Sequence, residues 1–387
     1  MKKILIISGV LLVLLVGGLM AFFLTTGGIP ANTDEVFARF GQGGAAPSFE
    51  EEEALEEEYG FAEDPAPTNS RARLRQLTTK PVAGATIIAG IARFVERGTG
   101  HVYEIDVRGG VERLISGTTL ARTIRALFSP SGEEVALMNE VDGHIVTTLG
   151  AFASGTGSGL SLTELPEGAI EPGFSRDSKT FYFFIPEDTG GRGYEYDQTK
   201  DTTKLLFRTS LRDIRLLWGS PTYLYTTPSG KQGGYLYEVG SDGLLSYVAN
   251  GGRGLMAMRH ASGTVVSTIT EDGRIVTRDT KAGIIPLVSL FTEKCAVAGV
   301  WSRYLVCGSP VVLPDGYTYP DDWFKGVVGL SDAIVHIDSS TLTTLVLSNL
   351  EEESGRPLDV LSLGTDATGK YIYFINKYDN ALWLLEL

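Results

Sequence analysis

The sequence predicts an all-β fold: a seven-bladed β-propeller of four-stranded antiparallel blades over residues 71–387. Three observations predict it. One strand-like segment recurs along this region, each copy has similar neighbours, and no convincing amphipathic helix interrupts them. A single four-stranded sheet cannot bury both of its faces, whereas sheets stacked radially bury each face against the next sheet.

The recurrent segment alternates polar and apolar residues and often closes on an acidic residue, as in His101-Val-Tyr-Glu-Ile-Asp106. Its seven copies start at residues 101, 144, 192, 234, 274, 333 and 381. Successive starts differ by 43, 48, 42, 40, 59 and 48 residues. Propeller blades repeat at about 40–50 residues, so seven copies predict seven blades.

The last unit has only three strand segments before Leu387. Its outer edge would therefore leave backbone donors and acceptors unpaired. The segment Arg73-Leu-Arg-Gln-Leu-Thr78 resembles the fourth strand of the other units, yet it precedes the first of them. We expect this N-terminal strand to close the ring as the fourth strand of the last blade.

Residues 1–25 are predicted to form a transmembrane signal anchor. Lys2 and Lys3 precede the uncharged stretch Ile4–Leu24, whose 21 residues would span a bilayer as a helix. A removed signal peptide is the alternative, but no convincing A-x-A cleavage pattern follows. Because the two lysines stay on the cytoplasmic side, both interpretations export the rest of the chain. The predicted location is the cell membrane, single-pass, with an extracytoplasmic C-terminal domain.

Residues 26–70 are predicted to be a disordered linker rich in Gly and Pro. Nine acidic residues between Glu50 and Asp64 repel one another and keep such a segment solvated and extended. The interpretation that we favour is a stand-off spacer, and an acidic docking peptide is the alternative.

The net charge of the chain is −14, from 33 Lys and Arg against 47 Asp and Glu. This balance argues against a nucleic-acid partner, whose phosphates must be neutralised by basic side chains. Residues 1–64 hold three basic and eleven acidic residues, so −8 of that charge belongs to the tether.

Catalytic motifs are absent from the sequence: it contains no G-x-S-x-G elbow, P-loop or H-E-x-x-H. The four histidines fall in four different repeats and indicate no common metal site. Two cysteines are too few for a disulfide-dense scaffold. The sequence therefore predicts a protein that is not an enzyme, with no metal site and no cofactor.

Cys295 and Cys307 flank a turn near Trp301, on two consecutive predicted strands. Opposite residues in an antiparallel hairpin have a constant index sum, so these two can face each other. An exported domain permits a disulfide between them. Two buried thiols on neighbouring strands are the alternative.

The interval of 59 residues marks one irregular unit, with extra residues between Gly308 and Asp332. Loops carry function disproportionately, and Tyr and Trp are preferred contact residues. The functional interpretation is a binding patch of aromatic side chains with two acids that orient a polar ligand. Its residues are Tyr317, Tyr319, Asp321, Asp322, Trp323 and Phe324. The alternative folds these aromatics onto the blade's own edge or the next blade.

Three turn segments carry a resemblance to a known family. Phe128-Ser-Pro-Ser-Gly132, followed by Glu-Glu-Val-Ala-Leu, resembles the turn-and-strand motif of TolB-like and WD-type propeller repeats. Phe174-Ser-Arg-Asp-Ser178 and Gly364-Thr-Asp-Ala-Thr-Gly369 are more divergent versions of it. The resemblance implies an interaction platform more often than an enzyme.

The function predicted from the sequence is a membrane-anchored extracytoplasmic propeller that serves as a protein–protein interaction scaffold in the cell envelope. Its expected partners are envelope proteins, and the membrane through the N-terminal helix. The alternative is a glycan-binding or glycan-processing propeller, a lyase or hydrolase that uses carboxylates in the central channel.

Overall fold

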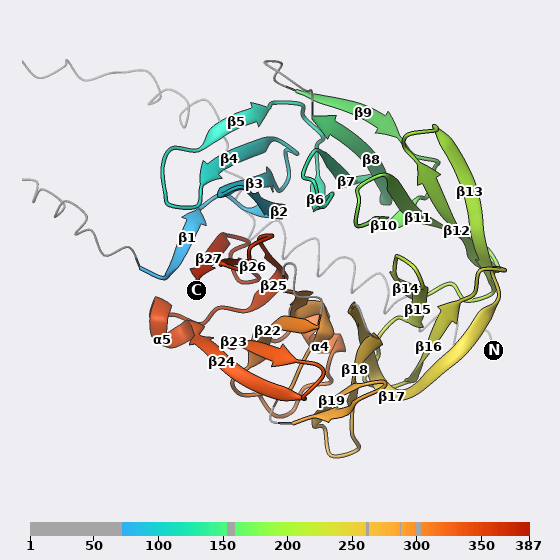
Figure 1. Cartoon of the computed structure of the whole chain (residues 1–387), viewed down its shortest axis with the longest axis vertical. Helices are drawn as coiled ribbons and strands as arrows, with labels where there is room; N and C mark the ends of the chain where they lie inside the picture. Colours follow the sequence, from blue (N-terminus) through green and yellow to red (C-terminus); the bar gives the residue numbers. More distant parts are fainter. Residues whose placement is uncertain (1–71, 153–158, 261–262, 287, 299–302) are drawn as a thin grey trace, which may run out of the picture. The chain divides into compact units, whose positions relative to one another are not determined.

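The computed structural model describes residues 72–387 apart from 153–158, 261–262, 287 and 299–302, so the predicted anchor and linker lie outside it. The part that it describes is almost entirely antiparallel β-sheet (Figure 1). Five of its six sheets have four strands, and one has seven. The prediction of an all-β fold of four-stranded antiparallel sheets is confirmed, with the seven-stranded sheet as the exception. No helix in these residues has the length and apolarity to cross a bilayer.

Consecutive strands pair within each sheet, and the first strand lies nearest the centre of the view in Figure 1. The first sheet consists of β2 (Val82–Ile88), β3 (Ile91–Glu96), β4 (Val102–Asp106) and β5 (Arg113–Ser116). The second consists of β6 (Thr123–Phe128), β7 (Glu134–Val141), β8 (His144–Phe152) and β9 (Leu160–Glu164). The third consists of β10 (Ile170–Phe174), β11 (Thr180–Glu187), β12 (Gly190–Asp197) and β13 (Thr202–Thr209).

The seven-stranded sheet comes next in the chain, followed by two more four-stranded sheets. The former is β14 (Ile214–Leu217), β15 (Thr222–Thr226), β16 (Gly233–Val239), β17 (Leu245–His260), β18 (Gly263–Ile269), β19 (Ile275–Asp279) and β20 (Gly283–Ile285). The latter are β21 (Cys295–Val297), β22 (Tyr304–Pro310), β23 (Asp332–Asp338) and β24 (Thr343–Asn349), then β25 (Val360–Thr365), β26 (Tyr371–Asn376), β27 (Leu382–Glu386) and β1 (Leu74–Thr78). Three short helices complete the described elements: η1 (Thr292–Lys294), α4 (Asp321–Phe324) and α5 (Leu350–Ser354).

Each of the seven recurrent sequence segments forms one strand: β4, β8, β12, β16, β19, β23 and β27. The closing acidic residue has a local role, because its carboxylate caps the turn to the next strand. Asp106, Asp197 and Asp338 each accept a hydrogen bond from the backbone N–H two residues later, at 2.8–3.0 Å. The repeat signal in the sequence is thus the signature of a capped strand end.

The three turn motifs also share one hydrogen-bonding pattern. In each, the polar residue after the first strand accepts a bond from the backbone N–H five residues later. The pairs are Ser129 with Glu134 at 3.1 Å, Ser175 with Thr180 at 2.9 Å, and Asp366 with Tyr371 at 2.8 Å. The motif therefore encodes a hairpin between the first and second strands of its sheet.

The apolar core lies between the faces of neighbouring sheets. Val95 and Val102 of the sheet that begins with β2 pack with Val135 and Leu137 of the next sheet, and all four are fully buried. Alternating side chains of each strand point to opposite faces, so every sheet contributes to two such layers. This arrangement satisfies the burial requirement that a lone sheet cannot meet.

The strand β1 closes the last sheet, as the sequence predicts. It pairs antiparallel with β27, with Leu74 opposite Leu385 and Gln76 opposite Trp383. Three of its residues, Leu74, Leu77 and Thr78, are buried. The edge of β27 is therefore paired with a strand from the other end of the described chain.

Strand β17 joins the two parts of the seven-stranded sheet. Its residues 245–253 pair with β16, and its residues 253–260 pair with β18. The change of partner falls at Gly252 and Gly254, whose φ values are 71° and 64°. Glycine is suited to this bend because it adopts positive φ without steric cost.

Deletion of residues 71–79 should lower the Tm by about 10 °C, because burial of two leucines contributes about 3–6 kcal/mol to a domain of this size. Circular dichroism melting of the full chain measures it. A deletion of residues 56–64 is the length-matched control and should leave the Tm unchanged. An unchanged Tm after deletion of 71–79 would contradict closure by β1.

Candidate functional site

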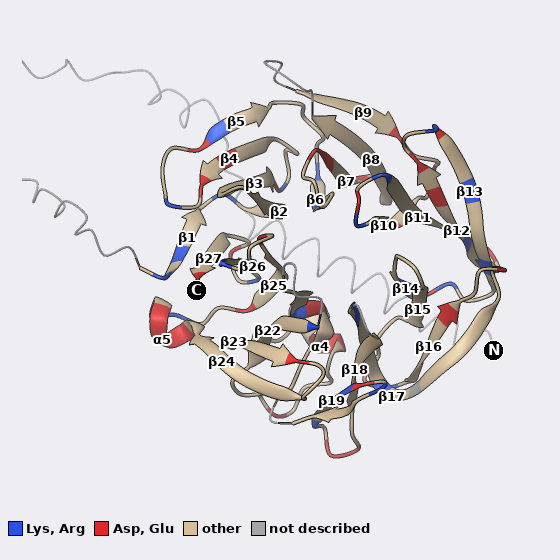
Figure 2. Cartoon of the chain, viewed as in Figure 1, with Lys and Arg blue, Asp and Glu red and all other residues tan. Residues whose placement is uncertain are grey.

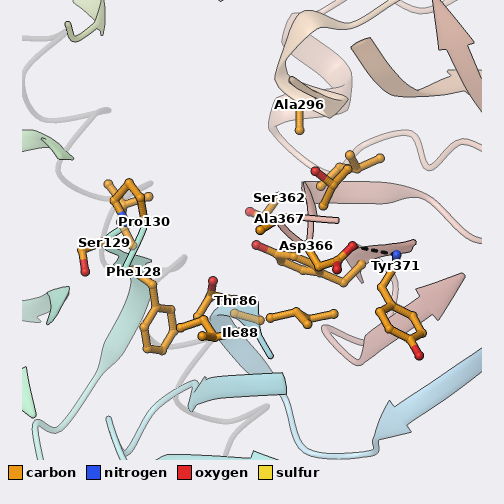
Figure 3. A pocket seen from close by; sticks show the side chains of 18 of the residues that line it. Thr86, Ile88, Phe128, Ser129, Pro130, Ala296, Ser362, Asp366, Ala367 and Tyr371 are labelled. Carbon is orange, nitrogen blue, oxygen red and sulfur yellow. Dashed lines mark hydrogen bonds between the residues drawn. The ribbon is translucent and has the colours of Figure 1, made fainter. Parts of the chain in front are cut away.

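A cavity of about 950 Å³ lies among the first strands of four sheets. Strands β2, β6, β21 and β25 and the turns that follow β2, β6 and β25 line it. Figure 3 shows Phe128, Ser129 and Pro130 on one side and Ser362, Asp366 and Ala367 on the other. We call this side of the domain the cavity face.

Bulges in the first strands shape the wall of the cavity. Strands β2, β6, β10 and β25 each shift register against the second strand of their sheet. A bulge bends its strand and changes the direction of the side chains that follow it. In β6 the shift falls between Thr123 and Arg125, and Arg125 lines the cavity.

Close backbone contact joins two of these strands. A Cβ atom on Gly84 of β2 would lie 2.0 Å from the carbonyl oxygen of Ala126 in β6. Only glycine permits this approach, which brings one wall of the cavity to the next.

Four charged side chains line the cavity, and they differ in their partners. The Lys370 ammonium binds Glu386 at 2.9 Å, and the Asp366 carboxylate caps its own turn. In contrast, Arg125 and Arg176 are exposed and have no hydrogen bond or ion pair with the residues that the structure describes. The two arginines are therefore the cations of the cavity that have no carboxylate partner among the described residues.

The side chains of the cavity offer contact, hydrogen bonding and charge to a ligand. The described residues that line it include no histidine, and their one acidic side chain is Asp366. Among them, the Thr368 hydroxyl donates to the Asp366 carboxylate, and the Lys370 ammonium donates to the Tyr371 hydroxyl at 3.1 Å. Aliphatic walls, hydroxyl groups and two cations can hold a ligand by contact and charge.

The residues predicted as a binding patch lie on the opposite side. Ala296 and Val297 of β21 line the cavity, and they pair with Val306 and Leu305 at the beginning of β22. Because β22 runs from there to Pro310, residues 311–331 follow at the end of the sheet away from the cavity. We call residues 311–331 the insertion.

Two aromatics of the predicted patch are buried. Tyr319 is 6% exposed and Trp323 is 1% exposed, so neither can contact a partner. The Tyr319 hydroxyl donates to the carbonyl of Pro314 at 2.9 Å, and burial raises its pKa to about 12. Both rings pack on Phe291. For these two residues the binding-patch interpretation is wrong, because their apolar area completes the core under the insertion.

The two acids of the predicted patch hold the insertion in place. The Asp321 carboxylate accepts a hydrogen bond from the backbone N–H of Gly230 in another sheet's loop. The Asp322 carboxylate accepts one from the backbone N–H of Thr318 at 2.7 Å. Both carboxylates are thus engaged with backbone groups. Tyr317 and Phe324 are exposed, at 41% and 39%, and a contact role for them stays a prediction.

A fully buried ion network fixes Trp323. The Lys294 ammonium lies 2.6 Å from carboxylate oxygens of both Asp332 and Asp359, and all three side chains have no exposed area. The Trp323 Nε1–H donates to the Asp359 carboxylate at 3.0 Å. The Lys377 ammonium lies 4.3 Å from the Trp323 ring centroid.

Burial perturbs the titration of this network. Burial raises the pKa of Asp332, with a further contribution from the neighbouring Asp359, while Lys294 opposes the shift. Burial also lowers the pKa of Lys377. A buried carboxylate without its ammonium partner would therefore be costly. The network ties the insertion to the start of β25, one of the cavity strands.

The predicted cysteine pair is bonded. Cys295 and Cys307 stand opposite each other in the β21–β22 ladder and form a disulfide. Cys307 is fully buried. The bond attaches the three-residue strand β21, which lines the cavity, to its sheet.

Sequence reasoning missed the cavity cations and the ion network. Arg176 lies inside a turn motif that the sequence singles out, which is the one available signal. Arg125, Lys294 and Asp359 belong to different units and carry no local pattern. No group of histidine, cysteine and acidic residues in the described chain could hold a metal ion.

Comparisons with known proteins identify the fold. No protein family and no curated protein matches the chain. Its structure is similar to the β-propeller domain of the Trilobed protease from Pyrococcus furiosus, with a TM-score of 0.51 and 9% identity over 79% of this chain and 95% of that one. It is also similar to oligogalacturonate lyase from Vibrio parahaemolyticus, with a TM-score of 0.52 and 8% identity over 82% of this chain and 94% of that one.

TolB from Acinetobacter baumannii is among the structural neighbours, at 14% identity over 77% of this chain and 64% of that one. Its TM-score of 0.40 is too low to carry an argument. At these identities a likeness shows the fold alone. The β-propeller fold that the sequence predicts is confirmed.

Replacing Lys294 with Met should lower the free energy of unfolding by about 3–5 kcal/mol, because two buried carboxylates lose their counter-ion. Denaturant titration of the full chain measures it. The control is Lys325→Met, an exposed lysine beside α4, which should change stability by less than about 0.5 kcal/mol. Equal effects in the two variants would contradict a stabilising role for the network.

The loss caused by Lys294→Met should also depend on pH. Without Lys294, the pKa of Asp332 in the folded state rises further above its unfolded value. A folded state that binds more protons than the unfolded state loses stability as pH rises. Denaturant titrations should therefore show a smaller deficit at about pH 5 than at about pH 8; the reverse order would contradict this account.

Proposed function

We propose that this protein is a membrane-anchored extracytoplasmic β-propeller that binds a protein partner at its cavity face, as an interaction scaffold of the cell envelope. The observation that carries the proposal is the open cavity with two arginines whose side chains have no partner among the described residues. The interaction-platform character implied by the turn motifs supports it.

We infer seven blades within this fold. The two parts of the seven-stranded sheet bury residues against each other, as separate blades do. Tyr225, Leu236 and Ala249 of the first part pack with Ala257 and Val266 of the second. Strand β17 then serves as the outer strand of one blade and the inner strand of the next.

The anchor and the linker complete the proposal. Residues 1–25 would hold the protein in the membrane and residues 26–70 would give the propeller reach. The chain enters the propeller on the cavity face, because the Arg73 carbonyl accepts from Glu386 and the Lys370 carbonyl accepts from Leu387, both at 2.9 Å.

The alternative is a glycan-binding or glycan-processing propeller. The fold likeness to oligogalacturonate lyase, an enzyme by its name, supports this candidate. The two cavity arginines suit an acidic sugar as well as an acidic peptide. Catalysis would need further side chains than Asp366, whose carboxylate is already engaged.

Site-specific photo-crosslinking in intact cells tests the proposal. A benzoylphenylalanine placed at Ala367, an exposed residue of the cavity, should give a discrete adduct that protease treatment removes. The matched control is the same residue placed at Thr203, exposed on the outer strand β13, which should give none.

Absence of an adduct at Ala367, or identical adducts at both positions, would contradict binding at the cavity face. A protease-resistant adduct at Ala367 would contradict a protein partner and favour the glycan alternative.

A further inference from the structure

We propose that the cavity takes an acidic peptide segment, one that carries Asp or Glu side chains between small apolar residues, with Arg125 and Arg176 as the groups that bind its carboxylates. The inference rests on the proposed function and specifies the chemistry of the partner.

The first argument is the state of the two arginines. Most arginines that the structure describes bind a carboxylate or a backbone carbonyl; Arg93, for example, is paired with Glu104. The exceptions in this part of the chain are Arg125, Arg176, Arg208 and Arg278, and two of these four line one cavity. An unpaired guanidinium in a concave wall is a ready partner for a carboxylate, which it can bind through two parallel hydrogen bonds.

The second argument is that two acids on this side of the domain already have partners. The Asp366 carboxylate accepts bonds from the backbone N–H groups of Thr368 and Tyr371, at 3.2 and 2.8 Å. Glu386 is held by Lys370 and Arg75 at 2.9 and 3.0 Å, and these contacts lower its pKa. Both carboxylates thus have partners, and the two arginines keep their charge for a ligand.

The third argument is the position of each arginine. Arg125 follows the bulge of β6, and Arg176 stands in the hairpin after β10. That hairpin is fixed by Ser175, whose hydroxyl donates to Asp177 at 2.6 Å. The two cations therefore come from backbone positions that the fold determines, which favours a defined ligand over loose attraction.

The remaining walls favour a peptide over a sugar. Ile88 and Leu127, both partly exposed, give the cavity aliphatic surface, which suits small apolar side chains. Sugars stack on open aromatic faces; of the three aromatic side chains that line the cavity, Phe128 and Tyr371 are each only 8% exposed and Tyr373 is partly buried. Thr86 and Ser362 add hydroxyl groups that can pair with a peptide backbone (Figure 3).

A second hollow, of about 520 Å³, is lined by Arg278 and is smaller than the cavity. Acidic and basic residues are interspersed along the sheets, and the acidic helix α5 lies outside the cavity strands (Figure 2). The exposed apolar residues of the insertion, such as Val312 and Val327, lie near one cation, the exposed Lys325. The cavity joins apolar wall to unpaired positive charge.

Fluorescence anisotropy with the purified full chain in detergent tests the inference. The probe is a fluorescein-labelled peptide of four Glu-Leu-Gly repeats, and its matched control replaces every Glu with Gln. The acidic peptide should bind at least tenfold more tightly, and its binding should weaken as salt rises.

The variants Arg125→Gln and Arg176→Gln should each weaken binding of the acidic peptide about tenfold, the size of effect expected for a charged hydrogen bond. The matched control is Arg208→Gln, which neutralises an unpaired, exposed arginine on β13 outside the cavity. It should leave binding unchanged. Unaltered melting curves would show that all three variants are folded.

Equal binding of the Glu and Gln peptides, or an equal loss in Arg208→Gln, would overturn the inference. So would binding of a galacturonate oligomer with the same dependence on both arginines when the acidic peptide does not bind. If a protein adduct forms at Ala367 and any of these results is also obtained, the proposed scaffold function is retained and only the acidic peptide is rejected as its ligand.

Discussion

Each sheet of this protein can bury its faces only against its neighbours, and the pairing of β1 with β27 completes the last of them. Without that pairing the edge of β27 would be open and the packed faces beside it would lose buried side chains such as Leu74. Closure also fixes where the chain enters the domain. Because β1 begins beside the end of β27, the first described strand starts on the cavity face.

The two ends of the strands have different roles in this fold. At one end, the insertion is held by backbone contacts of Asp321 and by the buried network of Lys294, Asp332 and Asp359. At the other end, the bulged first strands enclose a cavity whose arginines are unpaired. Buried charges of one end are balanced within the protein, whereas the free charge of the other is available to a partner.

Local features of this fold could be predicted from sequence, and features assembled from distant residues could not. The capped strand ends and hairpin turns depend on residues two to five positions apart, so their pattern survives in the sequence. Cys295 and Cys307 are only 12 residues apart in the sequence, so the constant index sum of an antiparallel hairpin predicts that they can face each other. Arg125 and Arg176 come from different sheets, and the side-chain direction of Arg125 depends on a register shift in β6. The aromatic sequence of the insertion is equally consistent with an exposed binding patch and with a small core. The hydrogen bond of the buried Trp323 with Asp359 favours the core for this residue.

The central claim is that partners bind at the cavity face. Hydrogen–deuterium exchange of the full chain, with and without the Glu-Leu-Gly peptide, tests it most directly. The account predicts slower exchange in the turns at residues 88–90, 131–134 and 366–371, which border the cavity, with the insertion unchanged. Slower exchange confined to residues 311–327 would contradict it and assign binding to the opposite side of the propeller.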